Sequence, residues 1–279
     1  MGERLILTGL PRSGTTLACR LLGQCRDCVA LAEPMDVLDI PADSTSRAID
    51  HIVAWMDHTR RGILATGTAP SKVGEDGLVD NPFSPSDAAG RRLLQVREGT
   101  LRIRAPLRPD FTLVVKHNAA FAALLPALAG RVRTVAVIRH PLAVLASWAS
   151  LALPVSDGRL PAGERLDRAL ARTLAGQDDL LERQRTILAW FFARYDTLPP
   201  GAVVRYEDMI ESAGTALFDA AGLAPAVRLE SLDNRNARTQ CPRDQLPRLA
   251  QALHGTPGPW ERWYPVDSIA PMLASMVAP

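Results

Sequence analysis

The stretch LILTGLPRSGTTLACRLL, residues Leu5–Leu22, decides the fold of this chain. It begins with a short apolar run, Leu5–Leu7, of the length of a buried strand, and continues into a loop that carries Gly9 and Gly14. From Thr15 onward the apolar residues recur with helical spacing. A strand, a glycine-bearing loop and a helix in this order present backbone N–H groups to a phosphate at the helix N-terminus. The stretch therefore predicts an anion site.

The glycine spacing of this loop is close to the nucleotide-binding pattern G-x-x-x-x-G-K-[ST]. Thr15 stands where that pattern has its lysine, and the one cation of the loop is Arg12. Because that lysine reaches the β- and γ-phosphates of a triphosphate, its replacement favours a smaller 5′-phosphoryl group. Backbone N–H groups and the hydroxyls of Ser13, Thr15 and Thr16 are expected to hold it. An ordinary glycine-containing turn is the alternative.

Length and composition suit one large α/β domain or two small ones, with 279 residues of which 47% are hydrophobic. A net charge of +2 is too small to support nucleic-acid binding by bulk charge. We expect a cytoplasmic protein, because no signal pattern precedes the first apolar run and no stretch reaches the length of a membrane span. The sequence carries no signal for an oligomeric state. Of the 32 basic residues, only Lys72 and Lys116 are lysine.

Four cysteines occur, and two of them form a C-x-x-C pair, Cys25 and Cys28. A zinc site would need two further ligands, and no second pair accompanies this one. We therefore expect reduced, structural cysteines and no metal site, with a metal or redox role as the alternative.

Apolar runs of strand length alternate with helical patterns along the chain, which predicts a mostly parallel sheet with helices on both faces. The expected strands after the first are 29–32, 111–115, 133–138 and 202–204, and the expected helices are 44–61, 119–129, 141–151, a long helix over 164–195, 244–254 and 267–277. Residues 62–87 show no periodic element. We expect 62–108 to form a lid or an acceptor-binding insertion, with disorder as the alternative.

Polar residues follow each of these strands, where the carboxyl ends of parallel strands form the ligand crevice. Glu33 follows the strand 29–32, and Pro34 is expected to keep it extended. Lys116–Asn118 follow the third strand, Arg139 the fourth, and Arg205–Asp208 the last. We expect these groups to gather at one edge of one sheet.

Three segments together resemble the sulfotransferases that use 3′-phosphoadenosine 5′-phosphosulfate (PAPS). Leu10–Thr16 looks like their 5′-phosphosulfate loop, and Arg139 with Ser147 looks like their 3′-phosphate motif. Tyr206–Asp208 resembles the Y-E-D segment that these enzymes carry late in the chain. The resemblance implies a three-layer, P-loop-like sulfotransferase fold and a single domain over residues 1–279. It also implies PAPS as co-substrate, its desulfated form PAP as product, and no metal.

The resemblance further implies which residues bind the donor. Arginine at position 12 is more similar to the tyrosylprotein and carbohydrate sulfotransferases than to the aryl and steroid enzymes, which usually have lysine there. The implied donor-binding residues are Pro11, Arg12, Ser13, Gly14, Thr15, Thr16, Arg139, Ser147 and Tyr206.

For the transfer itself, the resemblance implies Glu33, 21 residues after Arg12, as general base for an acceptor hydroxyl. Arg12 and Lys116 would stabilise charge on the sulfuryl group and on the leaving phosphate. His117 is the rival base. Adjacent strand residues point to opposite faces, so Lys116 and His117 are not both expected to enter the site.

Two other classes of function stay open from the sequence: a small-molecule kinase or NTPase, and a non-catalytic nucleotide-binding protein. The acceptor is not identified by the sequence. The regions expected to bind it, 36–108 and 153–165, contain few aromatic residues and several arginines, which disfavours a flat phenol and permits a carbohydrate, a lipid or an acidic peptide. The expected acceptor is a small molecule, a carbohydrate, a lipid or a peptide that offers a hydroxyl or an amine.

Overall fold

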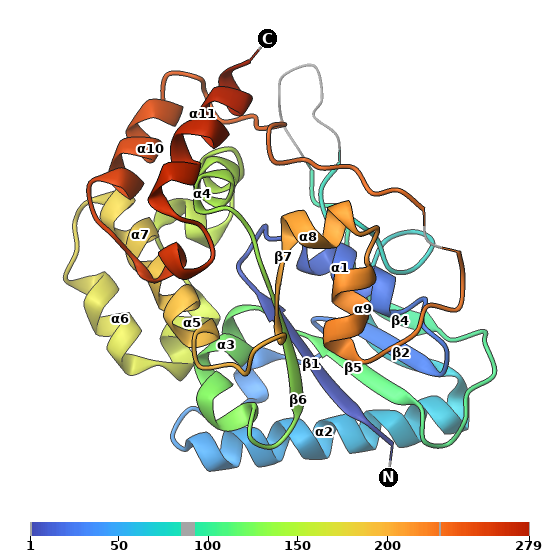
Figure 1. Ribbon diagram of the computed structural model, residues 1–279. Coiled ribbons are helices and arrows are strands. Elements are labelled where there is room, and N and C mark those ends of the chain that lie inside the picture. Colours follow the sequence, from blue (N-terminus) through green and yellow to red (C-terminus); the bar gives the residue numbers. More distant parts are fainter. Residues whose placement is uncertain (1, 85–92, 229, 279) are drawn as a thin grey trace.

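The centre of the computed structural model, which describes residues 2–84, 93–228 and 230–278, is a parallel five-stranded sheet (Figure 1). Its spatial order is β2-β5-β1-β6-β7, and every neighbouring pair is parallel. The strands are β1 (Arg4–Gly9), β2 (Cys28–Ala32), β5 (Thr112–Lys116), β6 (Arg133–Ile138) and β7 (Val203–Arg205). The predicted α/β class with a mostly parallel sheet is confirmed.

Helices cover both faces of the sheet, and neighbouring residues of a strand pack into different layers. Leu5 and Leu7 share a buried cluster with one set of helices, whereas Ile6 lies in a cluster with another. The first set is α1 (Thr15–Leu22), α8 (Tyr206–Glu211) and α9 (Thr215–Ala221). The second set is α2 (Thr45–Thr66) and α3 (Ala119–Leu128). Strands that are buried on both faces explain the continuous apolar runs of the sequence.

A third apolar cluster extends the second face beyond β6. It contains α4 (Pro141–Ala149), α6 (Arg168–Ala175), α7 (Leu180–Tyr195), α10 (Leu246–His254) and α11 (Ile269–Val277). Short elements connect these parts: α5 (Pro161–Leu166) and the 3₁₀ turns η1 (Val37–Asp39), η2 (Pro154–Asp157), η3 (Pro259–Arg262) and η4 (Val266–Ser268). Through this cluster the C-terminal helices support α4, which carries Ser147.

A separate antiparallel hairpin, β3 (Thr68–Val73) with β4 (Arg97–Arg102), lies beside the central sheet. The expectation of no regular element from residue 62 was wrong. α2 continues to Thr66, Gly67 ends it with a left-handed φ of 67°, and β3 follows directly. The strand is stabilised by pairing with β4, which lies far along the chain, so no local periodicity marks it. Residues 85–92 of the expected insertion are outside the described residues.

The expected long helix over 164–195 was also wrong, because α5, α6 and α7 replace it. Asp167 ends α5 and caps α6, accepting hydrogen bonds from the N–H groups of Ala169 and Leu170. Gly176 ends α6, and Asp179 caps α7. The apolar spacing continues across both breaks, which is why it predicts a single helix.

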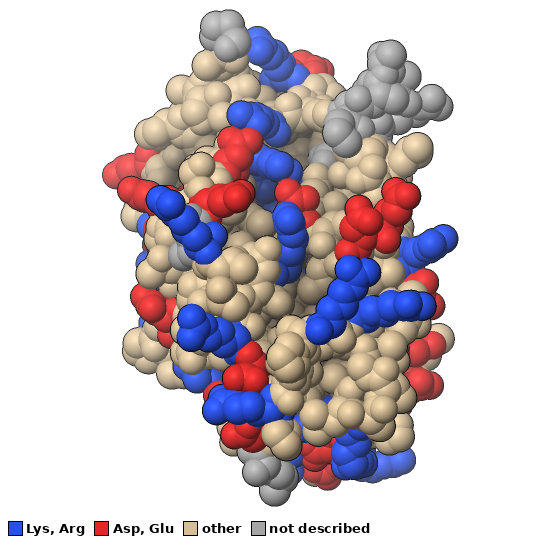
Figure 2. Space-filling view, turned by 90° about the vertical axis from the view of Figure 1, so that its right-hand side faces the viewer, with Lys and Arg blue, Asp and Glu red and all other residues tan. Residues whose placement is uncertain are grey.

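Lysine and arginine side chains are interspersed with aspartate and glutamate on the face shown in Figure 2, so neither charge forms a continuous patch on that face. Among the described residues, no helix is both long and apolar enough to cross a membrane.

Candidate active site

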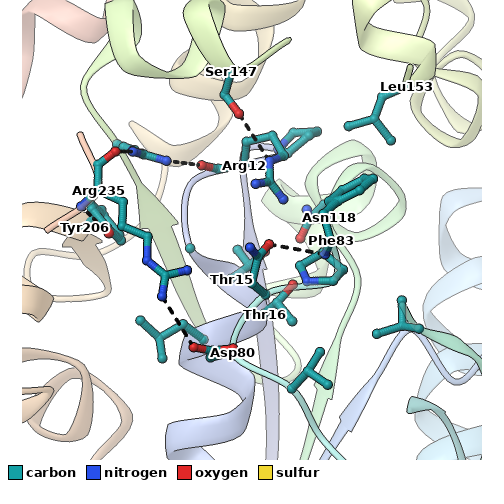
Figure 3. Close-up of a pocket in the computed structure, with 18 of the residues that line it drawn as sticks. Arg12, Thr15, Thr16, Asp80, Phe83, Asn118, Ser147, Leu153, Tyr206 and Arg235 are labelled. Atoms are coloured by element: carbon teal, nitrogen blue, oxygen red, sulfur yellow. Dashed lines mark hydrogen bonds and ion pairs between the residues drawn. The ribbon is translucent and has the colours of Figure 1, made fainter. Parts of the chain in front are cut away.

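A cavity of about 800 Å³ opens at the carboxyl edge of the central sheet (Figure 3). The end of every strand contributes to its lining, in the spatial order of the sheet. Taken across the sheet, these are Glu33 after β2, Lys116 at the end of β5, Pro11, Arg12 and Gly14 in the loop after β1, Arg139 after β6 and Tyr206 after β7. Of the groups expected at one sheet edge, these meet in one cavity. The lining does not include His117, Arg205, Glu207 or Asp208.

Gly14 shapes the loop at the point where α1 begins. Its φ of 94° is left-handed, and a Cβ at this position would lie 2.7 Å from Cδ2 of Tyr206. Both facts require glycine. Among the described residues, no side chain caps α1 and its first turn holds no acidic residue. The N–H groups and the positive end of the helix dipole are therefore available to an anion near Thr15 and Thr16, which line the cavity.

Ser13 has a different place from the one expected. Its side chain is buried and does not line the cavity. Its Oγ lies 2.9 Å from the carbonyl oxygen of Leu10 and 2.7 Å from that of Val137, and either oxygen can accept its proton. The hydroxyl therefore binds the loop to β6 and lies outside the cavity lining.

Arg12 links the loop to α4. Its φ of 75° is left-handed, and its Nε donates to Oγ of Ser147 at 3.2 Å. The guanidinium also lies over the ring of Phe83, 4.9 Å from the centroid. Close by, Nε1 of Trp148 donates to the carbonyl oxygen of Pro11 at 2.9 Å. Ser147 and Trp148 of α4 thus both hold the loop in place. Figure 3 shows the bond between Arg12 and Ser147.

Arg139 is buried beneath the loop and makes three hydrogen bonds. Its Nη1 donates to the carbonyl oxygen of Arg12 at 3.0 Å, and Nη2 donates to that of Arg235 at 2.8 Å. Its Nε donates to Oδ1 of Asn236 at 2.6 Å, and the group lies 4.6 Å from the ring centroid of Tyr206. A guanidinium has five N–H donors. Counted over the described residues, these three bonds leave two donors for an anion in the cavity.

A chain of buried and half-buried polar groups fixes Asn236, a residue that the sequence analysis missed. Its Nδ2 donates to Oε1 of Glu207 at 2.6 Å, and the hydroxyl of Tyr264 donates to Oε2 at 2.6 Å. The backbone N–H of His140 also donates to Glu207. Glu207 thus orients Arg139 through Asn236. In the sequence, only the place of Glu207 in the Y-E-D segment indicates that it orients Arg139.

Glu33 lies between two ammonium groups. Nζ of Lys116 is 2.6 Å from its Oε1, and Nζ of Lys72 is 2.6 Å from its Oε2. The charge of Lys116, and after it that of Lys72, holds the pKa of Glu33 well below its usual range against the opposing effect of burial. The carboxyl group is therefore ionised in the protein without ligand.

The backbone of Glu33 differs from the expectation based on Pro34. Its φ is 45°, so the residue is left-handed and not extended. Its N–H donates to the carbonyl oxygen of Lys116 at 2.8 Å, which holds the turn just beyond β2. Four described non-glycine residues have positive φ, and two of them are Glu33 and Arg12. Strain of this kind gathers at functional sites, where the surrounding structure maintains it.

His117 points away from the cavity, as strand alternation predicts. Its Nε2 accepts a hydrogen bond from the N–H of Met35 at 3.3 Å, and its ring meets Phe121 edge-on at 5.1 Å. Burial lowers the pKa of His117 to about 4, so its imidazole is neutral at pH 7. The structure brings Lys116 and Glu33 together and leaves His117 outside the lining.

Further lining residues come from two irregular segments, 78–83 and 232–240. Nη2 of Arg235 lies 3.8 Å from a carboxylate oxygen of Asp80, which joins the two segments across the cavity (Figure 3). Asn118 also lines the cavity, and its buried Oδ1 has no hydrogen-bond partner among the described residues. No periodicity in the sequence marks these segments.

Metal ligands do not gather in the described part of the chain, where no three His, Cys, Asp or Glu side chains are placed to hold an ion. All four cysteines are buried and unbridged, and burial raises the pKa of the Cys19 thiol to about 12.

No known family profile matches the sequence, and no curated protein matches it. Among solved structures, the chain is similar to the crystal structure of sulfotransferase STF1 from Mycobacterium tuberculosis H37Rv. The identity is 15% and the TM-score is 0.35, over 80% of this chain and 68% of that chain. A similarity this low does not establish a function for this chain.

Proposed function

We propose that the protein is a sulfotransferase that moves the sulfuryl group of PAPS to a hydroxyl or amine of an acceptor by in-line displacement. The order of groups along the sheet edge is the observation that carries this proposal. The carboxylate of Glu33 and the guanidinium of Arg139 line the cavity on opposite sides of the loop 10–14 between β1 and α1, called the anion loop below. An in-line transfer needs this order, with the base on the acceptor side of the sulfur and the leaving nucleotide on the other.

The donor has two anionic ends, and the cavity offers a group for each. The open N-terminus of α1, with Thr15 and Thr16, suits the 5′-phosphosulfate. The planar fork of Arg139 with the hydroxyl of Ser147 suits the 3′-phosphate. Tyr206, over which Arg139 lies, would hold the guanidinium flat.

In the transfer, Glu33 would accept the proton of the acceptor hydroxyl as general base. The bond from the acceptor oxygen to sulfur forms while the bond from sulfur to the 5′-phosphate oxygen breaks, and PAP keeps that electron pair. Lys116 and Arg12 would stabilise the charge that develops on the sulfuryl group and the leaving phosphate, with the N–H groups of α1. Since His117 is buried behind the strand, Glu33 is the proposed base.

The acceptor end of the cavity would lie beside Glu33. The insertion 62–108 contributes Lys72, which contacts Glu33, and it also contributes residues 78–83 and 94–96 to the cavity lining. We propose that this insertion binds the acceptor, a carbohydrate, lipid or peptide hydroxyl. The four free cysteines fit the expected cytoplasmic location.

The test is release of PAP from PAPS, with and without a panel of acceptors: an aliphatic alcohol, a monosaccharide, and a tyrosine peptide. We expect an acceptor to accelerate release, and Glu33→Gln to lower the accelerated rate by about 10²-fold or more while PAP affinity is retained. Asp36→Asn, three residues further along, serves as the matched control and should keep the wild-type rate.

Three outcomes contradict parts of the proposal. Equal rates in Glu33→Gln and wild type would transfer the role of base to another group, such as His117. Turnover of ATP with magnesium but not of PAPS would favour a kinase or NTPase. Binding of PAP without turnover in any variant would favour a non-catalytic nucleotide-binding protein.

A further inference from the structure

The two lysines of the chain meet at one carboxylate. Lys72 and Lys116 are the only lysines among 32 basic residues, and they contact the two oxygens of Glu33, each at 2.6 Å. Lys116 belongs to the central sheet, whereas Lys72 belongs to the β3–β4 hairpin. Two separate parts of the fold therefore deliver these ammonium groups to Glu33.

The backbone at Lys72 is held in place by the residue before it. The buried Oγ of Ser71 accepts a hydrogen bond from the backbone N–H of Ala32 at 3.0 Å. This bond joins β3 to the end of β2, directly before Glu33. The two lysines differ in exposure, because the side chain of Lys116 is 6% exposed and that of Lys72 is 38% exposed. Lys72 is the partner of Glu33 that has room to move.

Both carboxylate oxygens of Glu33 are occupied in the protein without ligand. A general base must place an oxygen within hydrogen-bond distance of the proton it takes. We propose that Lys72 is the displaceable partner of this base: the acceptor hydroxyl replaces its ammonium at Oε2, and the ammonium turns to the oxygens of the transferring sulfuryl group. Lys72 is then a catalytic residue for the reaction proposed above, on which this inference rests.

Displacement of the Lys72 ammonium changes how strongly basic Glu33 is. The groups that act on Glu33 or feel its charge are Lys116 from β5, Lys72 from β3, His117 after β5 and Cys19 from α1. The last two are neutral at pH 7, because burial lowers the pKa of the imidazole and raises that of the thiol. When the ammonium of Lys72 leaves Oε2, the pKa of Glu33 rises towards its ordinary value. The carboxylate becomes a stronger base when the acceptor arrives.

The first measurement is the titration of the Glu33 carboxyl group by carbon-13 NMR in the protein without donor, with its signal assigned from Glu33→Gln. Lys72→Met keeps the chain length and removes the charge, and we expect it to raise the pKa of Glu33 by about 1 to 2 units. Arg97→Met, a cation of the same hairpin on β4, is the control and should leave this titration unchanged. An unchanged titration in Lys72→Met would overturn the proposal.

The second measurement separates catalysis from folding and donor binding. In Lys72→Met we expect PAP affinity to stay within about twofold of wild type, because the partner of Lys72 among the described residues is Glu33, whereas Arg139 bonds to the anion loop at Arg12. PAPS turnover should fall, and the acid limb of its pH–rate profile should move to higher pH. An equal loss of PAP affinity and turnover would overturn the proposal by making Lys72 a donor ligand. Failure of the wild type to bind PAP would instead reject the proposed function.

Discussion

Arg139 at the end of β6 donates from Nη1 to the carbonyl oxygen of Arg12 at 3.0 Å, across 127 residues of sequence. Arg12 in turn donates to Oγ of Ser147 at 3.2 Å. The groups proposed for the two anionic ends of the donor are therefore one hydrogen-bonded unit. Because each group fixes another before a ligand arrives, little conformational freedom is lost on binding.

Glu207 should control donor binding without contacting the donor. Glu207→Gln replaces one of the two half-buried acceptor oxygens that hold Asn236 and Tyr264. We expect a loss of about 1–3 kcal/mol in the free energy of unfolding, measured by urea denaturation. PAP affinity should fall by about tenfold, equivalent to about 1.4 kcal/mol. Asp208→Asn, the half-exposed neighbour, should change stability by less than about 0.5 kcal/mol. Equal effects of both variants would contradict the role of Glu207.

Gly14 should tolerate no side chain. Gly14→Ala places a Cβ in a left-handed backbone and against the ring of Tyr206. We expect a destabilisation of at least about 1–2 kcal/mol, together with weaker PAP binding. Gly62→Ala in α2 is the matched control, since nothing lies within 4 Å of the added Cβ. It should stabilise the protein by about 0.5–1 kcal/mol. Thermal unfolding of both variants gives the comparison, and a stable Gly14→Ala variant would contradict the loop geometry.

Stability should decrease as the pH falls below neutrality. Burial lowers the pKa of His117 and of His140 to about 4, from an ordinary value of 6.5. Between pH 6.5 and 4 the unfolded chain therefore binds protons that the folded chain does not. The free energy of unfolding therefore decreases as the pH is lowered. Between pH 6.5 and 5 each histidine contributes a loss of about 2 kcal/mol. The lowered pKa of Glu33 continues this loss below the ordinary pKa of a glutamate.

The check is urea denaturation at several pH values between 7 and 5. His117→Asn should show a shallower slope of unfolding free energy against pH than wild type. His58→Asn, on an exposed part of α2, is the control and should keep the wild-type slope. Equal slopes in wild type and His117→Asn would contradict the buried, neutral state of the histidine.

The sheet and its edge can be predicted from the sequence because their signals are local. Buried parallel strands leave continuous apolar runs, and the crevice rule then gathers Glu33, Lys116 and Arg139 without knowledge of strand order. The breaks at Asp167 and Gly176 escape prediction, because apolar spacing continues across them. Helix caps decide such boundaries more than periodicity does.

The remaining site residues depend on contacts between distant segments. Lys72 reaches Glu33 only because β3 pairs with β4 and Ser71 bonds to Ala32. Asn236 reaches Arg139 from an irregular loop that has no period to detect. The φ of Glu33 likewise follows from its bond to Lys116, which overrides the local preference set by Pro34. Such tertiary relationships leave no pattern in a single sequence.

The most direct test of the central claim is calorimetric titration of the protein with PAP and with adenosine 5′-phosphate, which lacks the 3′-phosphate. We expect PAP to bind at least about tenfold tighter, and Arg139→Lys to remove that difference, since lysine lacks the planar fork. Arg133→Lys, at the other end of β6, should retain it. Equal affinity for both nucleotides in the wild type, or a preference for ATP with magnesium that is indifferent to Arg139, would contradict the account.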